Sequence, residues 1–297
     1  MRTTANLLLL LLLATAFAAT AGAESDPSAI LADPVSATEN AAPSKPEPPI
    51  QDNSFLVEEA YNQEDGVIQH ISFVQVLNTH DVVYTQTDEW PLRSLKHQLS
   101  VTASFDESGN YRAFGPGWGD TAINYRYQLV GSGETRLAVS PRLSMLMPTG
   151  DSGSGRGYGG WGLQTNLPIS FQLNRYIVTH WNAGLTWIPS AQDAQHNHAT
   201  LVNPNLAQST VWLVKPRFNA LCEVVWTNNA SVEAAGQVAR QQALFVSPGV
   251  RWAYNFKSGL QIVPGVGVPI GLMGAAGQRG AIFYLSFEHP FAFAHSR

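Results

Sequence analysis

The stretch Glu134–Met147 reads ETRLAVSPRLSMLM, and it decides the fold. From Leu137 to Met147 every odd position is apolar, while the even positions are Arg136, Ala138, Ser140, Arg142, Ser144 and one leucine, Leu146. A period of two predicts a β-strand with one apolar and one polar face. Its 14 residues exceed the roughly 5 or 6 of a strand in a soluble sandwich. They are enough for the roughly 9 to 11 residues of a tilted strand that crosses a membrane.

The same alternation recurs along the chain, for example in Trp161–Leu173 and Ala243–Phe256. We expect twelve strands, over residues 55–61, 66–78, 92–106, 119–130, 134–147, 160–173, 175–188, 206–214, 217–228, 243–256, 259–270 and 280–291. From the third strand on, tight turns alternate with long polar loops at 107–118, 148–159, 189–205, 229–242 and 271–279. An even strand number with this asymmetry predicts an antiparallel outer-membrane β-barrel with both termini in the periplasm. A secreted β-sandwich is the alternative, but it explains neither the strand lengths nor the alternating loops.

Composition agrees with a barrel. Charged residues make up 13% of the chain, about half the share of a typical soluble protein. In each strand, alternate residues face lipid, where charge is excluded. The residues between them line a narrow lumen, where Ser, Asn, Gln and Gly are suitable. The net charge of -5 argues against a nucleic-acid partner, and a single cysteine, Cys222, excludes a disulfide framework.

Two segments precede the expected barrel. Residues 1–23 have the form of a signal peptide: a basic start, the leucine run Leu7–Leu13, and Ala21-Gly22-Ala23 as a cleavage site. A single-pass anchor is the alternative, but the apolar run is short for a bilayer. Residues 24–53 contain six of the 18 prolines and six acids against one lysine, which predicts a disordered periplasmic linker. The expected barrel, residues 54–297, then has 16 acids and 15 bases and is nearly neutral.

The last strand carries a further signal. Its outward parity is apolar and aromatic from Ala281 to Phe291, and we expect Phe287 and Phe291 to form the signal that the barrel assembly machinery reads. Six residues, 292–297, follow that signal. Six tryptophans near strand ends fit the aromatic girdles of a membrane barrel, although packing in a core would also place them there: Trp90, Trp118, Trp161, Trp187, Trp226 and Trp252.

Three segments carry a resemblance to a known family. They are residues 55–70, residues 117–127 with their Gly-Trp-Gly-Asp-Thr turn, and Tyr284–Phe291. The chain resembles, over nearly all of residues 54–291, the family named for the MetA pathway of phenol degradation. The resemblance implies an outer-membrane barrel of transporter type, found beside genes of aromatic degradation.

The alternation along the strands predicts which charged side chains point into the lumen. We expect Lys96, Arg126, Arg136, Arg142 and Arg251 to line it, with Glu223 as a counter-charge. Such a wall would favour anions or polarisable aromatic solutes through charge and arginine stacking. The alternative is structural: these arginines pair with acids and amides and close a small lumen.

Apparent enzyme and metal motifs are weak. Gly150-Asp151-Ser152-Gly153 lacks the rest of a serine protease, and Gly153–Gly160 lacks the lysine of a phosphate loop. His180–Gly184 resembles an outer-membrane phospholipase motif but lacks its serine. His196 and His198 are too few ligands for a specific metal site. Cys222 falls on the apolar parity and is expected to be lipid-facing or packed.

The sequence therefore predicts an outer-membrane channel or transporter for small solutes, with aromatic or hydrophobic compounds as the class the resemblance implies. Its partners would be outer-membrane lipid, the assembly machinery and a small-molecule solute, and no cofactor, metal or catalysis is implied. Two alternatives stay open: a structural or interaction barrel that transports nothing, and an outer-membrane hydrolase.

Overall fold

A computed structural model describes residues 49–92, 94–107 and 116–291 of the protein. The expected signal peptide and the linker up to residue 48 lie outside the described residues, as does the tail 292–297. Within the described part of the chain, no helix has the length and apolar character needed to cross a membrane.

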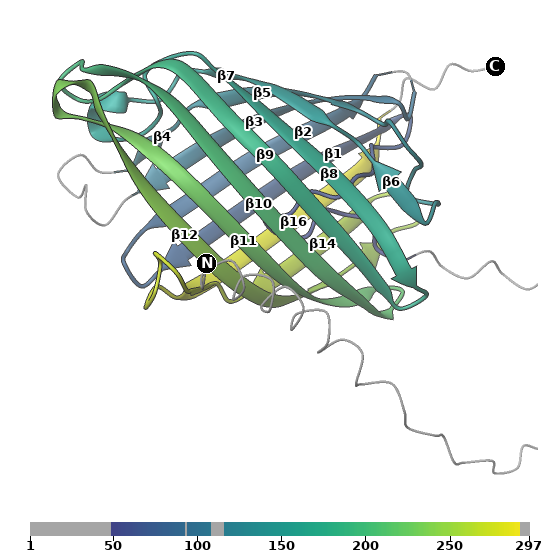
Figure 1. The fold of residues 1–297 in the computed structure, drawn as a ribbon. Coiled ribbons are helices and arrows are strands. Elements are labelled where there is room, and N and C mark those ends of the chain that lie inside the picture. Colours follow the sequence, from purple (N-terminus) through teal and green to yellow (C-terminus); the bar gives the residue numbers. More distant parts are fainter. Residues whose placement is uncertain (1–48, 93, 108–115, 292–297) are drawn as a thin grey trace, which may run out of the picture.

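The protein is an all-β, closed, antiparallel barrel of twelve strands (Figure 1). Consecutive strands pair in order around the wall, and β1 pairs with β16 from Val67↔Pro290 to Leu77↔Gly280, which closes it. Eight strands are single elements: β1 Val67–Leu77, β2 Val82–Pro91, β3 His97–Glu107, β8 Gly162–Asn174, β9 Ile177–Gln192, β10 His198–Lys215, β11 Phe218–Glu233 and β16 Gly280–Pro290. The other four are each split into two segments: β4 Gly117–Trp118 with β5 Thr121–Tyr127, β6 Leu137–Val139 with β7 Arg142–Met147, β12 Gln237–Trp252 with β13 Tyr254–Asn255, and β14 Gln261–Gly267 with β15 Ile270–Gly271.

Prolines account for two of these four interruptions. Pro141 stands between β6 and β7, and Pro269 directly precedes β15. Proline has no N–H to donate to a neighbouring strand, so a ladder hydrogen bond is missing at each of these two positions, whereas β8 and β10 accommodate Pro168 and Pro204 without a break. The strands nevertheless continue across the break, and the barrel stays closed.

The expected number of strands is confirmed, and the expected strand 66–78 is β1, but the expected strand 55–61 is wrong and β2 is not among the expected strands. Residues 55–61 are not a strand; they lie inside the barrel. The strand β2 occupies residues that we assigned to a connection. The reason is chemical: on β2 both faces are polar, with Thr87 and Glu89 turned inward and Gln86 and Asp88 outward, so the segment shows no apolar parity.

The two ends of the barrel differ less than expected. At the end where β1 begins and β16 finishes, which we call the termini end, the connections are 92–96, 128–136, 175–176, 216–217 and 256–260. At the opposite end, which we call the loop end, the expected loops 189–205 and 229–242 are wrong, because the strands β9 to β12 continue through them for 16 to 18 residues each. The connections there shrink to 193–197 and 234–236. The long connection 148–161 keeps the expected length and contains one 3-10 turn, Ser152–Ser154.

The outward face is mostly apolar, as the alternation predicts. Leu143, Leu163, Leu185, Leu206 and Phe283 are each between 42 and 52% exposed, which suits a wall that meets hydrocarbon. One stripe departs from this pattern on β1, β2 and β16, where outward polar side chains form a hydrogen-bonded row: His289, His70, Asp88, Gln86, Ser72 and Tyr84. The row satisfies its own polar groups, so fewer of them remain to be solvated.

An apolar cluster fills one side of the barrel interior. Ile50 and Phe55, from the segment before β1, pack with inward side chains of β1, β10, β11, β14 and β16: Ile71, Phe73, Val211, Leu221, Val263, Ile282 and Tyr284. The expectation of a wholly polar lumen is therefore wrong on this side, because the segment inside the barrel needs a core of its own to pack against.

Candidate functional site

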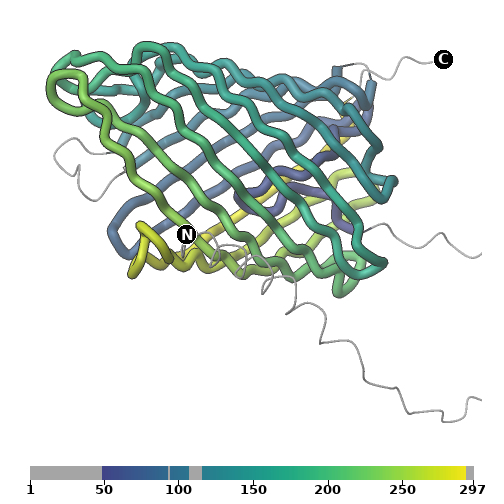
Figure 2. Tube along the Cα trace, viewed as in Figure 1, coloured from purple at the N-terminus to yellow at the C-terminus, as the bar shows by residue number. Residues whose placement is uncertain are grey.

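The segment of residues 49–63, which we call the strap, lies inside the barrel. Figure 2 shows its dark purple trace within the ring of strands, next to the start of β1. It carries no strand or helix of its own, so its backbone N–H and C=O groups need partners elsewhere. Inward side chains of the wall supply them. Because the strap begins near Gly133 and leaves toward β1, it enters and exits at the termini end.

Glu223 holds the apex of the strap. One oxygen, Oε1, accepts hydrogen bonds from the backbone N–H groups of Phe55, Leu56 and Val57 at 3.0, 2.9 and 3.0 Å. Successive N–H groups turned toward one point form a concave site for an anion. The Glu223 carboxylate is fully buried there, and it compensates three donors that would otherwise be unpaired.

Arg251 and Asp52 fix the incoming limb of the strap. The guanidinium of Arg251 donates to the carbonyl oxygens of Asp52 and Asn53. The Asp52 carboxylate accepts from Gln69 Nε2 at 2.8 Å and from the Tyr284 hydroxyl at 2.6 Å. The strap is thereby joined to β12, β1 and β16 at once.

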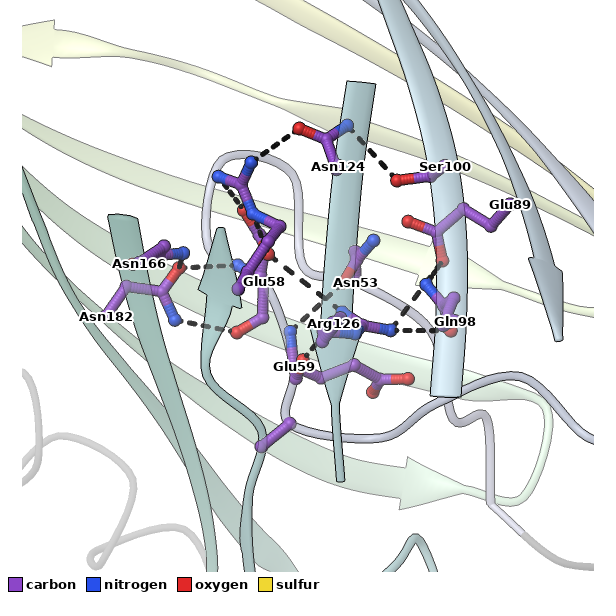
Figure 3. A network of polar contacts seen from close by, with 12 residues as sticks. Asn53, Glu58, Glu59, Glu89, Gln98, Ser100, Asn124, Arg126, Asn166 and Asn182 are labelled. Atoms are coloured by element: carbon purple, nitrogen blue, oxygen red, sulfur yellow. Dashed lines mark hydrogen bonds and ion pairs between the residues drawn. The ribbon is translucent and has the colours of Figure 1, made fainter. Parts of the chain in front are cut away.

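Arg126 fixes the returning limb (Figure 3). Its guanidinium donates to the carbonyls of Glu59 and Tyr61, at 3.2 and 2.6 Å, and to the side chain of Asn62 at 3.0 Å. It also donates to Gln98 Oε1 at 3.1 Å, and Gln98 in turn donates to Glu89 at 2.6 Å. Arg126 is 3% exposed, and all three nitrogens of its guanidinium donate to groups inside the protein.

Arg142 reaches the strap from above its apex. Its Nη2 lies 2.8 Å from Glu58 Oε1 and its Nε 3.1 Å from Glu58 Oε2, a two-point ion pair. Asn182 binds the backbone of Glu58 through two hydrogen bonds. Its Oδ1 accepts from the Glu58 N–H at 2.9 Å, and its Nδ2 donates to the Glu58 carbonyl at 2.8 Å. Glu58 is therefore held by both its backbone and its side chain.

The Phe55 ring rests on three glycines of β12 and β14. A Cβ placed on Gly249, Gly265 or Gly267 would come within 2.4, 2.6 or 2.8 Å of ring carbons of Phe55. These positions lack a side chain where the ring approaches the wall. Glycine here makes room for the strap.

Above the strap, on the loop-end side, the lumen opens into two adjoining cavities. The larger, of about 360 Å³, reaches from Phe55 and Glu58 to inward residues of β1, β2, β3 and β5. The second, of about 290 Å³, lies over β8 to β11 and shares Leu56, Glu58, Arg142 and Gln164 with the first. We call the two together the chamber. A cavity of only about 50 Å³ lies on the termini-end side of the strap, and it shares no lining residue with either part of the chamber.

Burial also changes the acidity of the strap. Desolvation raises the pKa of the Glu59 carboxyl well above its ordinary value, and the positive charges of Arg251 and Arg126 offset this only in part. The pKa of the Asp52 carboxyl is raised for the same reason, again against the attraction of Arg251. The strap therefore carries acidic groups that lie inside the barrel more favourably when protonated.

Of the charged residues assigned to the lumen, Arg126, Arg142, Glu223 and Arg251 all lie inside the barrel and all contact the strap. Lys96 and Arg136 do not lie on the lumen wall. Lys96 is exposed in the 92–96 turn, and Arg136 is exposed in the 128–136 turn, where its guanidinium lies over the Phe171 ring. Both residues continue the alternation of inward-facing positions. They lie beyond the ends of the strands, however, where the alternation no longer determines which way a side chain points.

Sequence reasoning missed the strap itself and its amide partners. Gln98, Gln128, Asn182 and Gln69 contact it through side chains. Three of them face inward from their strands, and Gln128 directly follows β5. A signal was present, because inward amides are frequent on these strands. The Phe55–Val57 stretch, however, is a short apolar run, and no local pattern separates such a run from a buried strand.

The other motifs take structural positions. His180 Nδ1 lies 2.7 Å from Ser170 Oγ, and both side chains are buried beneath the strap, where Ser170 also accepts the N–H of Ala60. His196 and His198 have separate neighbours, Gln192 and Ser190. Asp151 caps the 3-10 turn of its loop. Cys222 is partly buried on the outward parity of β11.

Comparisons with known proteins bear on the fold. No protein-family model matches the chain, and no curated protein matches it either. Among solved structures, an outer membrane channel from Pseudomonas putida is similar over 78% of this chain and 98% of that one, with a TM-score of 0.58 and 13% identity. The NanC porin (TM-score 0.48, 6% identity, 75% of this chain and 100% of that one) and the KdgM porin (0.45, 9%, 76% and 99%) are more distant in shape. At this identity the likeness to the Pseudomonas putida channel shows a shared barrel architecture.

Proposed function

We propose that the protein is an outer-membrane channel for small solutes whose passage is controlled by the strap. The similarity in fold to an outer membrane channel supports the membrane location, together with the apolar outward face. The chamber that ends on the strap is the observation that carries the proposal. A solute entering from the loop end reaches this floor, which is a segment of the chain and not a strand of the wall.

The strap is suited to movement because polar contacts hold much of it. Its chief anchors are hydrogen bonds and ion pairs to Glu223, Arg251, Arg126 and Arg142, and water can replace such bonds at modest net cost. The arginines expected to attract solute thus have a different role in the proposal: they hold the closed state. An apolar cluster around Phe55 and Ile50 opposes release and keeps the closed state populated.

We retain membership of the phenol-degradation family as part of the proposal. It implies aromatic or hydrophobic solutes, and Phe55, Phe73 and Tyr284 give one side of the chamber ring surfaces on which such solutes could pack. The barrel assembly machinery and outer-membrane lipid are the partners that this location requires. No catalytic role is proposed, since Ser170 and His180 are occupied beneath the strap.

One observation favours the non-transporting alternative: four charged residues of the lumen contact the strap, as they would in a permanently closed barrel. A reversible disulfide between the strap and the wall distinguishes the channel from the permanently closed barrel. Ser54 Oγ and Ser209 Oγ lie 2.7 Å apart, so Ser54→Cys with Ser209→Cys places two thiols near bonding distance, in a Cys222→Ser background that leaves no other cysteine.

We expect the oxidised, locked barrel to show little conductance in planar bilayers, and the reduced barrel to conduct as the Cys222→Ser parent does. Equal conductance before and after reduction would show that the strap does not control passage. Absence of conductance in the parent and in both redox states would favour the structural barrel.

A further inference from the structure

The part of the chamber over β8 to β11 has an unusual lining. Apart from the Glu58–Arg142 pair, all of its lining residues are uncharged, and five of them are asparagines: Asn166, Asn182, Asn203, Asn205 and Asn229. Thr186, Thr227 and the Tyr158 hydroxyl add further neutral polar groups. The floor of this cavity is the strap residue Glu58 together with Leu56. We call this cavity the amide pocket.

Charge in the amide pocket is cancelled locally. Glu58 and Arg142 meet at two points, so neither presents an uncompensated charge to the cavity. An ion entering the pocket would lose hydration without gaining a partner of opposite sign. The pocket therefore disfavours charged solutes of either sign.

Several polar side chains of the amide pocket, in contrast, have hydrogen-bonding groups that no other residue in the described ranges uses. The side chains of Asn205, Thr227 and Asn229 make no hydrogen bond with the part of the chain that the structure describes. Asn166 is 8% exposed, and its Oδ1 is buried without a partner, while its Nδ2 donates to Asn182. A free amide offers two donors and an acceptor, so the wall can satisfy a solute that both donates and accepts.

These unused groups stand on neighbouring strands. Asn205 pairs in register with Thr227 across β10 and β11, and Asn229 is the next inward residue along β11. Asn205 also lies over Gly184, where a Cβ would come within 2.7 Å of its amide atoms. Several donors and acceptors thus face one space of about 290 Å³, a size that suits a small ligand.

We propose that the amide pocket binds uncharged, hydroxyl-rich solutes of about monosaccharide size, and that it selects against charged relatives of the same shape. This inference rests on the proposed channel function, because it names a class of solute that one part of the chamber accepts. It is separate from the ring surface of Phe55, Phe73 and Tyr284 in the other part of the chamber.

The test measures binding without requiring transport. Saturation-transfer NMR on the purified full-length protein in detergent would compare glucose with glucuronate, which has the same ring and adds one carboxylate. The variant Asn205→Leu with Asn229→Leu removes two unused amides at similar volume. Asn228→Leu is the matched control, since it changes the same residue type on the opposite face of β11. Heat-modifiable migration would verify that each variant is folded.

We expect a glucose signal at least several times that of glucuronate, reduced several-fold by the double variant and unchanged by Asn228→Leu. The single variants Asn205→Leu and Asn229→Leu, which disturb the wall less, should each give a partial loss. A glucuronate signal equal to or stronger than that of glucose would overturn the proposal, as would an unchanged glucose signal in a folded double variant. Because no current is measured, a protein that never conducts can still pass or fail this test.

Discussion

Arg142 and Glu58 join the barrel wall to the strap through two contacts, of 2.8 and 3.1 Å. The first residue belongs to β7 and the second to the strap, and both line the two parts of the chamber. Their mutual compensation makes the chamber close to neutral where its two parts adjoin. Neutralising Arg142 and neutralising Glu58 should therefore change the ion preference of the pore in opposite directions.

Arg142→Gln leaves Glu58 uncompensated and should make the pore prefer cations, whereas Glu58→Gln should make it prefer anions. A unit charge about 10 Å from an ion in water changes its energy by about 0.4 kcal/mol, so the permeability ratio should shift about twofold. Reversal potentials in a KCl gradient measure this. Arg136→Gln, on an exposed arginine outside the lumen, should leave the ratio unchanged. Shifts of the same sign in both pair variants would contradict the assignment.

Glu223→Ala should loosen the apex of the strap, because three backbone N–H groups lose their common acceptor. Hydrogen bonds to a charged group contribute about 1.5 to 3 kcal/mol each, so amide exchange at Phe55–Val57 should quicken by about tenfold or more. Hydrogen–deuterium exchange with mass spectrometry reports these amides. Glu233→Gln, at the exposed end of the same strand, is the control. Unchanged exchange at the apex would exclude Glu223 as its anchor.

Gly265→Ala should displace Phe55, because the added Cβ would lie 2.6 Å from a ring carbon. Overpacking of this kind costs about 1 to 3 kcal/mol. The cost should nearly vanish in a Phe55→Ala background, where the ring is gone, and a double-mutant cycle on strap exchange would show the difference as coupling. Additive effects would mean that Gly265 acts on the wall and not through Phe55.

The strap should be held more firmly in acid. Burial raises the pKa of the Glu59 carboxyl above its ordinary value of 4.5, so the inserted strap binds this proton more tightly than a released strap does. Insertion is then most favourable below about 4.5 and weakens as the pH rises through the raised pKa. The charged and titratable groups that influence Glu59 are Arg251, Arg126, Asp52, Glu288 and Tyr61.

Single-channel recordings across the range from acid to neutral pH would test this, with open probability expected to rise with pH. Glu59→Gln should flatten the dependence, since a neutral amide replaces the titrating group. Glu134→Gln, in an exposed turn, should leave the profile unchanged. A fall in open probability with rising pH would contradict the expected direction.

Phe287→Asp together with Phe291→Asp should prevent membrane insertion. Phe287 faces outward on β16, and Phe291 follows the strand at the termini end. The change at Phe287 therefore adds charge to the lipid side, and both changes alter the expected assembly signal. Loss of the heat-modifiable band would show the failure. Phe287→Leu with Phe291→Leu keeps both positions apolar and should fold normally if charge is the cause, whereas a folded aspartate double variant would refute the expected orientation.

The wall could be predicted from the sequence because a strand between lipid and lumen must alternate. Leu143 and Arg142 lie on opposite faces for this reason, and the same rule places Glu223 and Arg251 inside. The rule failed at Lys96 and Arg136, which lie past the strand ends. It also failed on β2, where a lumen residue such as Thr87 and an outward residue such as Asp88 are both polar.

The strap could not be predicted in this way. Several of its backbone hydrogen bonds go to side chains more than 100 positions away, as between Val57 and Glu223 or Glu58 and Asn182. No local period encodes such partners. Phe55 is a clear example, because its place depends on three glycines of the paired strands β12 and β14, which are far from it in the sequence.

The strap enters and leaves the barrel at the same end. This shape determines the order in which a mechanical load would reach its contacts. A pull on Pro49 toward that end would strain the Gln51 contact to Gly133 first, then the Arg251 contacts to Asp52 and Asn53. The Glu223 contacts at the apex would be strained only afterwards. Bonds loaded in turn break at lower force than bonds loaded together. The strap would therefore peel out gradually under a weak, sustained tension, while the β1–β16 seam of the barrel stays paired.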